Sequence, residues 1–158
     1  MRFAPDYAML LAAGYGTRLA ALSAELPKPL LPVANVPLLH WAAQLCLHHG
    51  VTDLLVNAHH LADRLGSALG DGSELGVAVQ VSPESQILGT GGGIKRMAAL
   101  RPRGTCLVVN AKLVTDVDLG PVFALHRQRG ALATMVLKRV DEPERWGAIG
   151  GDDEGRIT

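Results

Sequence analysis

The sequence predicts an α/β protein with a Rossmann-like three-layer fold, in which helices cover both faces of a mainly parallel, twisted sheet that is truncated on its C-terminal side. Short apolar or β-branched runs alternate with helix-length segments along the chain. Such alternation implies right-handed crossovers between parallel strands. With 158 residues, 48% of them hydrophobic and 19% charged, the chain can bury one core, which excludes a disordered polymer.

Five segments are expected to be strands because they are short, apolar and bounded by turn residues. They are residues 7–12, 53–57, 77–82, 105–110 and 132–138. Helices are expected over residues 38–49, 61–69, 94–100 and 122–129. The first helix stops at Gly50, which can take the left-handed conformation of a helix C-terminus. Residues 146–149 and 156–158 are expected to form a hairpin whose second strand is barely begun, so that the chain stops within the fold.

Composition and charge exclude several classes of function. Fifteen basic residues offset fifteen acidic ones, so no long-range attraction to nucleic acid or to an anionic membrane is expected. No apolar run approaches the roughly 18 residues that span a bilayer, and residues 1–12 lack a signal-peptide cleavage site, so a cytoplasmic location is expected. Cys46 and Cys106 lie in separate apolar segments, which favours buried thiols over a disulfide or a metal-ligand pair.

The segment directly after the first expected strand, residues 11–19, has the composition of a phosphate-binding loop. Gly14 and Gly16 let backbone N–H groups approach a phosphate chain, and the guanidinium of Arg18 suits phosphate oxygens. A plain strand-to-helix turn has similar glycines, so that alternative stays open. Leu19 replaces the third glycine of the dinucleotide fingerprint, and no Gly-Lys-Ser or Gly-Lys-Thr follows, so these two familiar phosphate loops are excluded.

Lys28 strengthens the phosphate-binding interpretation. It follows Arg18 by ten residues and lies between Pro27 and Pro29, which fix the backbone and prevent a helix. Two flanking prolines restrict where the lysine stem begins. The pattern therefore favours a positioned cation over a mobile surface charge.

These motifs together resemble the signature of the sugar-1-phosphate nucleotidyltransferases. The matching runs are Leu-Ala-Ala-Gly-Tyr-Gly-Thr-Arg-Leu at 11–19, Pro-Lys-Pro-Leu-Leu-Pro-Val at 27–33, and Asn35-x-Pro37-Leu38-Leu39. A later stretch, Ser82-Pro83-Glu84 followed by Leu-Gly-Thr-Gly-Gly-Gly-Ile at 88–94, looks like the family's segment against the base and ribose. Within the family the chain is most similar to the mannose-1-phosphate guanylyltransferases and the N-acetylmuramate-1-phosphate uridylyltransferases. The resemblance implies one nucleotidyltransferase domain over residues 1–158, with the nucleotide-binding part present and the acceptor part incomplete.

The resemblance also implies a reaction and two substrates, a nucleoside triphosphate and a sugar 1-phosphate. A sugar-phosphate oxygen attacks the α-phosphorus and pyrophosphate leaves, so the protein mainly positions groups and neutralises charge. Arg18 and Lys28 are the implied catalytic residues, at the pyrophosphate and at the α-phosphate. The implied nucleotide-binding residues are Leu11, Ala12, Ala13, Gly14, Gly16, Thr17, Glu84, Gly89, Thr90 and Gly91.

Two features of the expected ligand edge concern the base and the substrate. Glu84 would accept two N–H bonds from guanine but only one from uracil, and the sequence favours neither base. His59 and His60 follow the second expected strand, and ligands bind beyond the carboxyl ends of strands in such sheets. A substrate role for these histidines is one interpretation, and an ordinary structural role is the other.

The chain departs from the family at one position. After the fourth strand the family has an aspartate that holds the catalytic Mg²⁺, and this chain has Lys112 in the run Asn-Ala-Lys at 110–112. An ammonium group cannot ligate magnesium and repels it, so the family's cofactor is not expected to bind here and no metal ligand is assigned. Asp116 and Asp118 are close in sequence, but Asp118 is expected to cap a helix N-terminus.

Two functional classes therefore remain open. The chain is either a nucleotidyltransferase with an altered or truncated sequence, or a non-catalytic nucleotide-binding module derived from that family. A nicotinamide-dependent oxidoreductase would share the alternating fold, but the absent third glycine argues against it.

Overall fold

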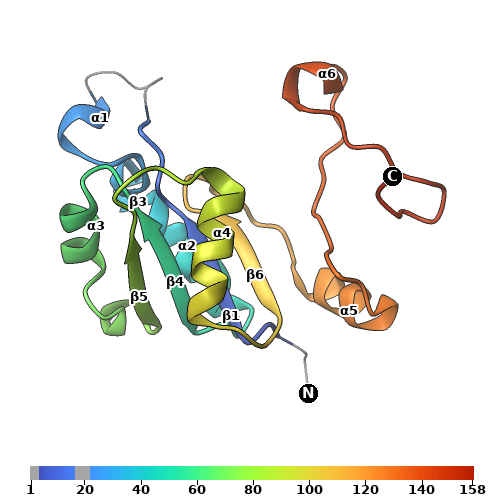
Figure 1. Ribbon diagram of the computed structural model, residues 1–158, viewed down its shortest axis with the longest axis horizontal. Coiled ribbons are helices and arrows are strands. Elements are labelled where there is room, and N and C mark those ends of the chain that lie inside the picture. The colour runs from blue at the N-terminus through green and yellow to red at the C-terminus, as the bar shows by residue number, and fades with distance from the viewer. Residues whose placement is uncertain (1–3, 17–21) are drawn as a thin grey trace. The chain divides into compact units, whose positions relative to one another are not determined.

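Four parallel strands form the central sheet, in the order β5–β4–β1–β6 (Figure 1). The strands are β1 (Tyr7–Leu11), β4 (Asp53–Ala58), β5 (Ala78–Pro83) and β6 (Cys106–Asn110). The structure is a computed structural model that describes residues 4–16 and 22–158. The chain divides into two units, Met1–Ala124 and Leu125–Thr158, and the sheet belongs to the first. The expected parallel α/β sheet is thus confirmed.

The register of the sheet aligns four residues in one row near the carboxyl ends of the strands. Leu11 is the partner of Asn57 in β4 and of Asn110 in β6. Asn57 is in turn the partner of Ser82 in β5. The loops that follow these strands therefore leave from a single edge of the sheet, at the top of Figure 1.

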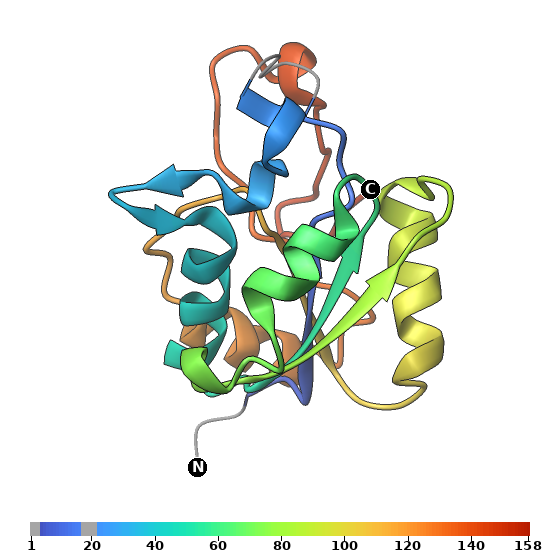
Figure 2. The same ribbon diagram turned by 90° about the vertical axis from the view of Figure 1, so that its left-hand side faces the viewer.

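Helices cover the two faces of the sheet. Figure 2 shows α2 (Leu38–His48, teal) and α4 (Gly89–Leu100, yellow) on opposite sides of it, and α3 (Ala62–Leu69) packs on the α2 side. Alternate residues of a strand point to opposite faces. Leu10 accordingly packs with the residues of α2 and α3, whereas Met9 packs with Met97 of α4. This confirms the three-layer architecture.

Helix α2 forms because its apolar residues recur at helical spacing on one face. Leu39, Ala42, Ala43 and Cys46 are all buried against the sheet. The helix ends before Gly50, which has a φ of +81°, as the sequence predicted.

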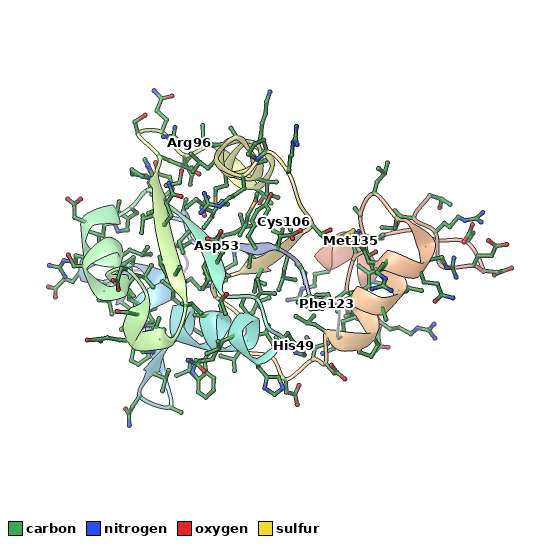
Figure 3. All side chains as sticks on the ribbon, turned by 90° about the horizontal axis from the view of Figure 1, so that it is seen from below. His49, Asp53, Arg96, Cys106, Phe123 and Met135 are labelled. Atoms are coloured by element: carbon green, nitrogen blue, oxygen red, sulfur yellow. The ribbon has the colours of Figure 1, made fainter. Side chains whose placement is uncertain are left out.

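The side chain of His49, just after α2, packs on the start of α5 (Gly120–Arg129) (Figure 3). Its ring lies edge to face with that of Phe123, with 6.1 Å between the centroids. Asp118 Oδ1 accepts a hydrogen bond from the N–H of Gly120 at 2.9 Å, but α5 begins at Gly120, so Asp118 lies one position before the N-cap that the sequence predicted it to be.

Short elements connect β1 to α2. They are α1 (Leu22–Glu25), the 3₁₀ helix η2 (Lys28–Leu30), and the antiparallel pair β2 (Pro32–Val33) and β3 (Val36–Pro37). Ala34 and Asn35 turn the chain between β2 and β3 with positive φ angles of 51° and 63°. A further 3₁₀ helix, η3 (Ser73–Leu75), precedes β5.

Three sequence-based expectations need correction. Residues 132–138 form no strand, and the side chains of Leu132, Met135, Val136 and Leu137 are exposed. An apolar run becomes a strand only where a neighbouring strand pairs with it, and among the described residues none does. Helix α4 begins at Gly89, earlier than the expected residue 94. The expected C-terminal hairpin is a single antiparallel bridge between Gly151 and Ile157, and residues 143–146 form the short helix α6 (Pro143–Trp146).

Both cysteines are free thiols, as expected. Burial raises the pKa of the Cys46 thiol to about 12 and that of the Cys106 thiol to about 11. Both groups therefore stay protonated at neutral pH and are poor nucleophiles. Within the described parts of the chain, every helix is too short or too polar to cross a membrane.

A pair of leucine substitutions tests the assignment of the core. Leu54 is fully buried between the sheet and its helices, whereas Leu132 is fully exposed. Leu54→Ala should lower the free energy of unfolding by about 2–5 kcal/mol, because it removes buried contacts and leaves a cavity. Leu132→Ala should change it by no more than about 0.5 kcal/mol. Urea unfolding followed by circular dichroism measures both, and equal losses would contradict the assignment.

Candidate nucleotide-binding site

A pocket lies at the carboxyl edge of the sheet, where the loops after β1 and β6 meet the start of η2. Its volume is about 120 Å³. Three segments that are distant in sequence line it, through Leu11, Ala12, Gly14, Gly16, Lys28, Pro29 and Lys112. Most small-molecule pockets measure about 300–1,000 Å³, so the part lined by these residues suits a phosphate group or two rather than a whole nucleotide.

The loop after β1 turns sharply and leaves space beside Gly14. The N–H of Gly14 bonds to the carbonyl of Ala12 at 2.9 Å, and Gly16 has a φ of +66°, which favours glycine. A Cβ added at Gly14 would meet nothing within 4 Å, so the backbone there is open to a ligand. Thr17 and Arg18, which the sequence assigned to the phosphates, lie outside the described residues.

Asn57 holds this loop to the sheet. Its side chain is buried, with only 4% exposed, and its Oδ1 accepts hydrogen bonds from the N–H groups of Ala12 at 2.7 Å and Ala13 at 3.3 Å. These two N–H groups therefore point inward to Asn57. Since buried polar groups need partners, the asparagine both satisfies the loop and fixes its position.

The same asparagine joins the first loop to the start of α4. Asn57 Nδ2 donates to Glu84 Oε1 at 2.8 Å, and Glu84 Oε2 accepts from the N–H of Leu88 at 3.0 Å. The carboxylate of Glu84 is 5% exposed and both of its oxygens are engaged. Contact of Glu84 with a base stays a prediction, and the observed bonds favour a role in positioning.

Gly93 permits this connection. A Cβ added there would lie 2.7 Å from Asn57 Nδ2 and 3.1 Å from Glu84 Oε1, so the buried pair fits under α4 only because position 93 lacks a side chain. Gly89, Thr90 and Gly91, which the sequence assigned to nucleotide binding, form the exposed first turn of α4 and are not among the residues that line the pocket.

A second chain of hydrogen bonds fixes Tyr15 in the first loop. His59 Nδ1 lies 2.8 Å from the carbonyl oxygen of Glu84, and His59 Nε2 lies 3.0 Å from the hydroxyl of Tyr15. Because a carbonyl can only accept, Nδ1 carries the proton, and in the neutral ring Nε2 accepts from Tyr15. Both ring nitrogens of His59 are thus hydrogen-bonded, one of them to Tyr15 of the first loop.

Two lysines contribute the charge of the pocket. Lys28 is half-buried between the buried residues Pro27 and Pro29. The prolines were expected to prevent a helix, but Lys28–Leu30 form the short 3₁₀ helix η2, with Pro29 inside it. Lys112 is exposed and follows β6 after Ala111, whose N–H bonds to the carbonyl of Leu11 at 3.2 Å. Neither ammonium group has a hydrogen-bonded or ionic partner within residues 4–16 and 22–158.

The residues of the pocket do not fit a magnesium centre. Magnesium takes oxygen ligands in octahedral geometry, and the lining side chains offer two ammonium groups and no carboxylate. Across the described parts of the chain, no group of three or more His, Cys, Asp or Glu residues could hold a metal ion.

Sequence reasoning missed Asn57. The available signal was a polar side chain at the end of an otherwise apolar strand, in the run Asp-Leu-Leu-Val-Asn-Ala at 53–58. A buried polar residue at the carboxyl end of a parallel strand has to bond to something at the ligand edge.

Two glycine substitutions in one helix test the Asn57–Glu84 connection. Gly93→Ala should lower the free energy of unfolding by about 1–3 kcal/mol, because the new methyl group collides with the buried pair. Gly91→Ala is the matched control, since a Cβ there meets nothing within 4 Å. It should leave stability unchanged or raise it by up to about 1 kcal/mol, as alanine favours helix. Equal stability of the two variants in urea would show that position 93 is not constrained.

Comparison with known proteins places the chain in a family. Residues 7–158 match the family described as nucleotidyl transferase. The chain is 34% identical to UTP–glucose-1-phosphate uridylyltransferase of Synechocystis over 95% of its length and 42% of the relative's. It is 33% identical to mannose-1-phosphate guanylyltransferase of Mycobacterium tuberculosis, over 96% of its own length and 42% of the relative's. It is 41% identical to N-acetylmuramate alpha-1-phosphate uridylyltransferase of Neisseria meningitidis, over 73% of its own length and 51% of the relative's. The chain thus spans about half the length of these relatives, or less.

Solved structures agree with the fold. A Bacillus anthracis structure named for glucose-1-phosphate thymidylyl transfer superposes with a TM-score of 0.87 at 23% identity, over 96% of this chain and 61% of that one. HddC from Yersinia pseudotuberculosis, solved with GMP-PN, superposes with a TM-score of 0.70 at 22% identity. The superposition covers 96% of this chain and 66% of that one. With its matched sequence and its parallel α/β sheet, the chain belongs to the nucleotidyl transferase family.

Proposed function

We propose that this chain supplies the nucleotide-binding part of an enzyme that transfers a nucleoside monophosphate from a nucleoside triphosphate to a sugar 1-phosphate. The observation that carries the proposal is the convergence of the glycine loop and Lys28 in one pocket at the carboxyl edge of a parallel sheet. Ligands of such sheets bind at this edge. The names of the similar proteins, which specify uridylyl and guanylyl transfer to sugar phosphates, support the same reaction.

The proposed chemistry requires little covalent work from the protein. An oxygen of the sugar phosphate forms a bond to the α-phosphorus, the bond from that phosphorus to the bridging oxygen breaks, and pyrophosphate leaves with the electron pair. Catalysis of this reaction rests on alignment of the two substrates and on neutralisation of charge. In the proposal, Lys28 neutralises charge on the phosphates, and the small residues of the first loop let the phosphates approach its backbone.

The size of the pocket indicates which part of the nucleotide binds there. A volume of about 120 Å³ suits the phosphates better than a whole nucleotide. We therefore assign the base and ribose to the open backbone of the first loop and to the first turn of α4. Gly89 to Gly91 present few side-chain atoms there, and a helix N-terminus attracts polar ligand groups. Glu84 acts in this proposal by holding Asn57 and the N–H of Leu88, not by reading the base.

A second candidate function is nucleotide binding without turnover. Lys112 favours it, because an ammonium group lines the pocket where a carboxylate could have held a metal ion. Measuring pyrophosphate release beside a binding titration with the same nucleotide separates the two candidates. Binding with release supports the transferase, and binding without release supports the module.

Substitution of Lys28 tests the site directly. Lys28→Ala should weaken the binding of GTP, UTP or dTTP by about tenfold to a hundredfold, because it removes a hydrogen bond to a charged group. The melting temperature should stay nearly unchanged. Lys138→Ala is the control, since it removes the same charge from an exposed position in the second unit. Isothermal titration calorimetry of the three proteins measures the affinities, and equal affinity for all of them would remove Lys28 from the site. The same loss is expected for Arg18→Ala.

A further inference from the structure

The pocket carries positive charge that nothing in the described structure neutralises. Lys28 and Lys112 come from two segments that are distant in sequence, and both line the same small pocket. No carboxylate is among the lining residues, and neither ammonium has a partner within the described residues. Two like charges that share a pocket repel each other, and a bound anion removes that repulsion.

The carboxylate of Glu84, which lies beneath the first loop, is already engaged. Both carboxylate oxygens of Glu84 hold hydrogen bonds beneath the first loop. Neither oxygen of this carboxylate is therefore free to bind a divalent ion. A free cation such as Mg²⁺ would also be repelled by the two lysines.

We propose that this pocket binds the phosphate chain of its nucleotide without a divalent cation, and that Lys112 together with Lys28 supplies the positive charge. The inference rests on the proposed function and deepens it, because it concerns how the same site holds its triphosphate. Lysine binds phosphate as a point charge and needs no particular orientation of the phosphate oxygens. The ligand is thus the metal-free polyphosphate chain.

The proposal predicts that affinity depends on whether the triphosphate carries magnesium. Magnesium neutralises part of the charge of a triphosphate, so the complexed ligand is a weaker partner for two lysines. Affinity should be equal or higher in the presence of a chelator than with excess magnesium. It should also fall as salt is added, because the attraction is between charges.

The experiment compares ligand binding with EDTA and with excess magnesium, by calorimetry on the 158-residue chain. The ligands are inorganic triphosphate and the tightest-binding nucleotide among GTP, UTP and dTTP. Wild type should bind both ligands in EDTA at least as tightly as in magnesium. Lys112→Ala should weaken binding in EDTA about tenfold or more. Lys112→Asp should weaken it further in EDTA and should recover affinity when magnesium is added. Lys138→Ala should match wild type.

Each other result overturns a specific part of the account. Nucleotide binding that needs magnesium would contradict the metal-free site while leaving the proposed function intact. Unchanged affinity of Lys112→Ala would remove Lys112 from the site. If no nucleotide bound in either condition while the chain stayed folded, the proposed function itself would fail. Unfolding midpoints of all variants confirm the fold, and Lys112→Gln replaces Lys112→Asp if the latter unfolds.

Discussion

The geometry of the carboxyl edge depends on one buried hydrogen bond, from Asn57 Nδ2 to Glu84 Oε1. Both side chains are almost completely removed from water, and each is also bonded to backbone N–H groups, Asn57 to the first loop and Glu84 to Leu88. A buried polar group without its partner costs about 1–3 kcal/mol, so the members of this network stabilise one another. The consequence is that the two glycine-rich segments are fixed relative to each other before any ligand arrives.

The parallel sheet explains why these residues can meet at all. Its register places Asn57 beside Leu11, so the polar side chain lies next to the point where β1 becomes a loop. The neighbouring strand β6 ends in the same row, and Lys112 therefore lines the pocket from the loop that follows it. Rigid strands hold the ends of the loops, and glycines leave the loop backbone uncovered. A site of this kind needs few side chains, and here the charged ones in the described lining are both lysines.

Much of this arrangement could be predicted from the sequence because it rests on local patterns. The apolar spacing of residues 38–48 predicted α2, and the four strands of the sheet were expected within a residue or so of their bounds. The glycine loop and the proline-flanked Lys28 were predicted from composition, and they share a pocket as inferred. The Asn57–Glu84 bond joins positions 27 residues apart and has no local signature. Residues 132–138 show the opposite error, since an apolar run indicates a strand only when a partner strand is present.

Backbone amide NMR of the isotopically labelled chain during titration with a nucleoside triphosphate tests the central claim, that the first loop, the start of α4 and Lys112 form one nucleotide site. The account predicts that the amides of Gly14, Gly16 and Lys112 shift together with those of Gly89 and Gly91, along a single binding curve. Amides of residues 125–158 should change little by comparison. Shifts confined to residues 125–158, or an unchanged first loop at saturating nucleotide, would contradict the account.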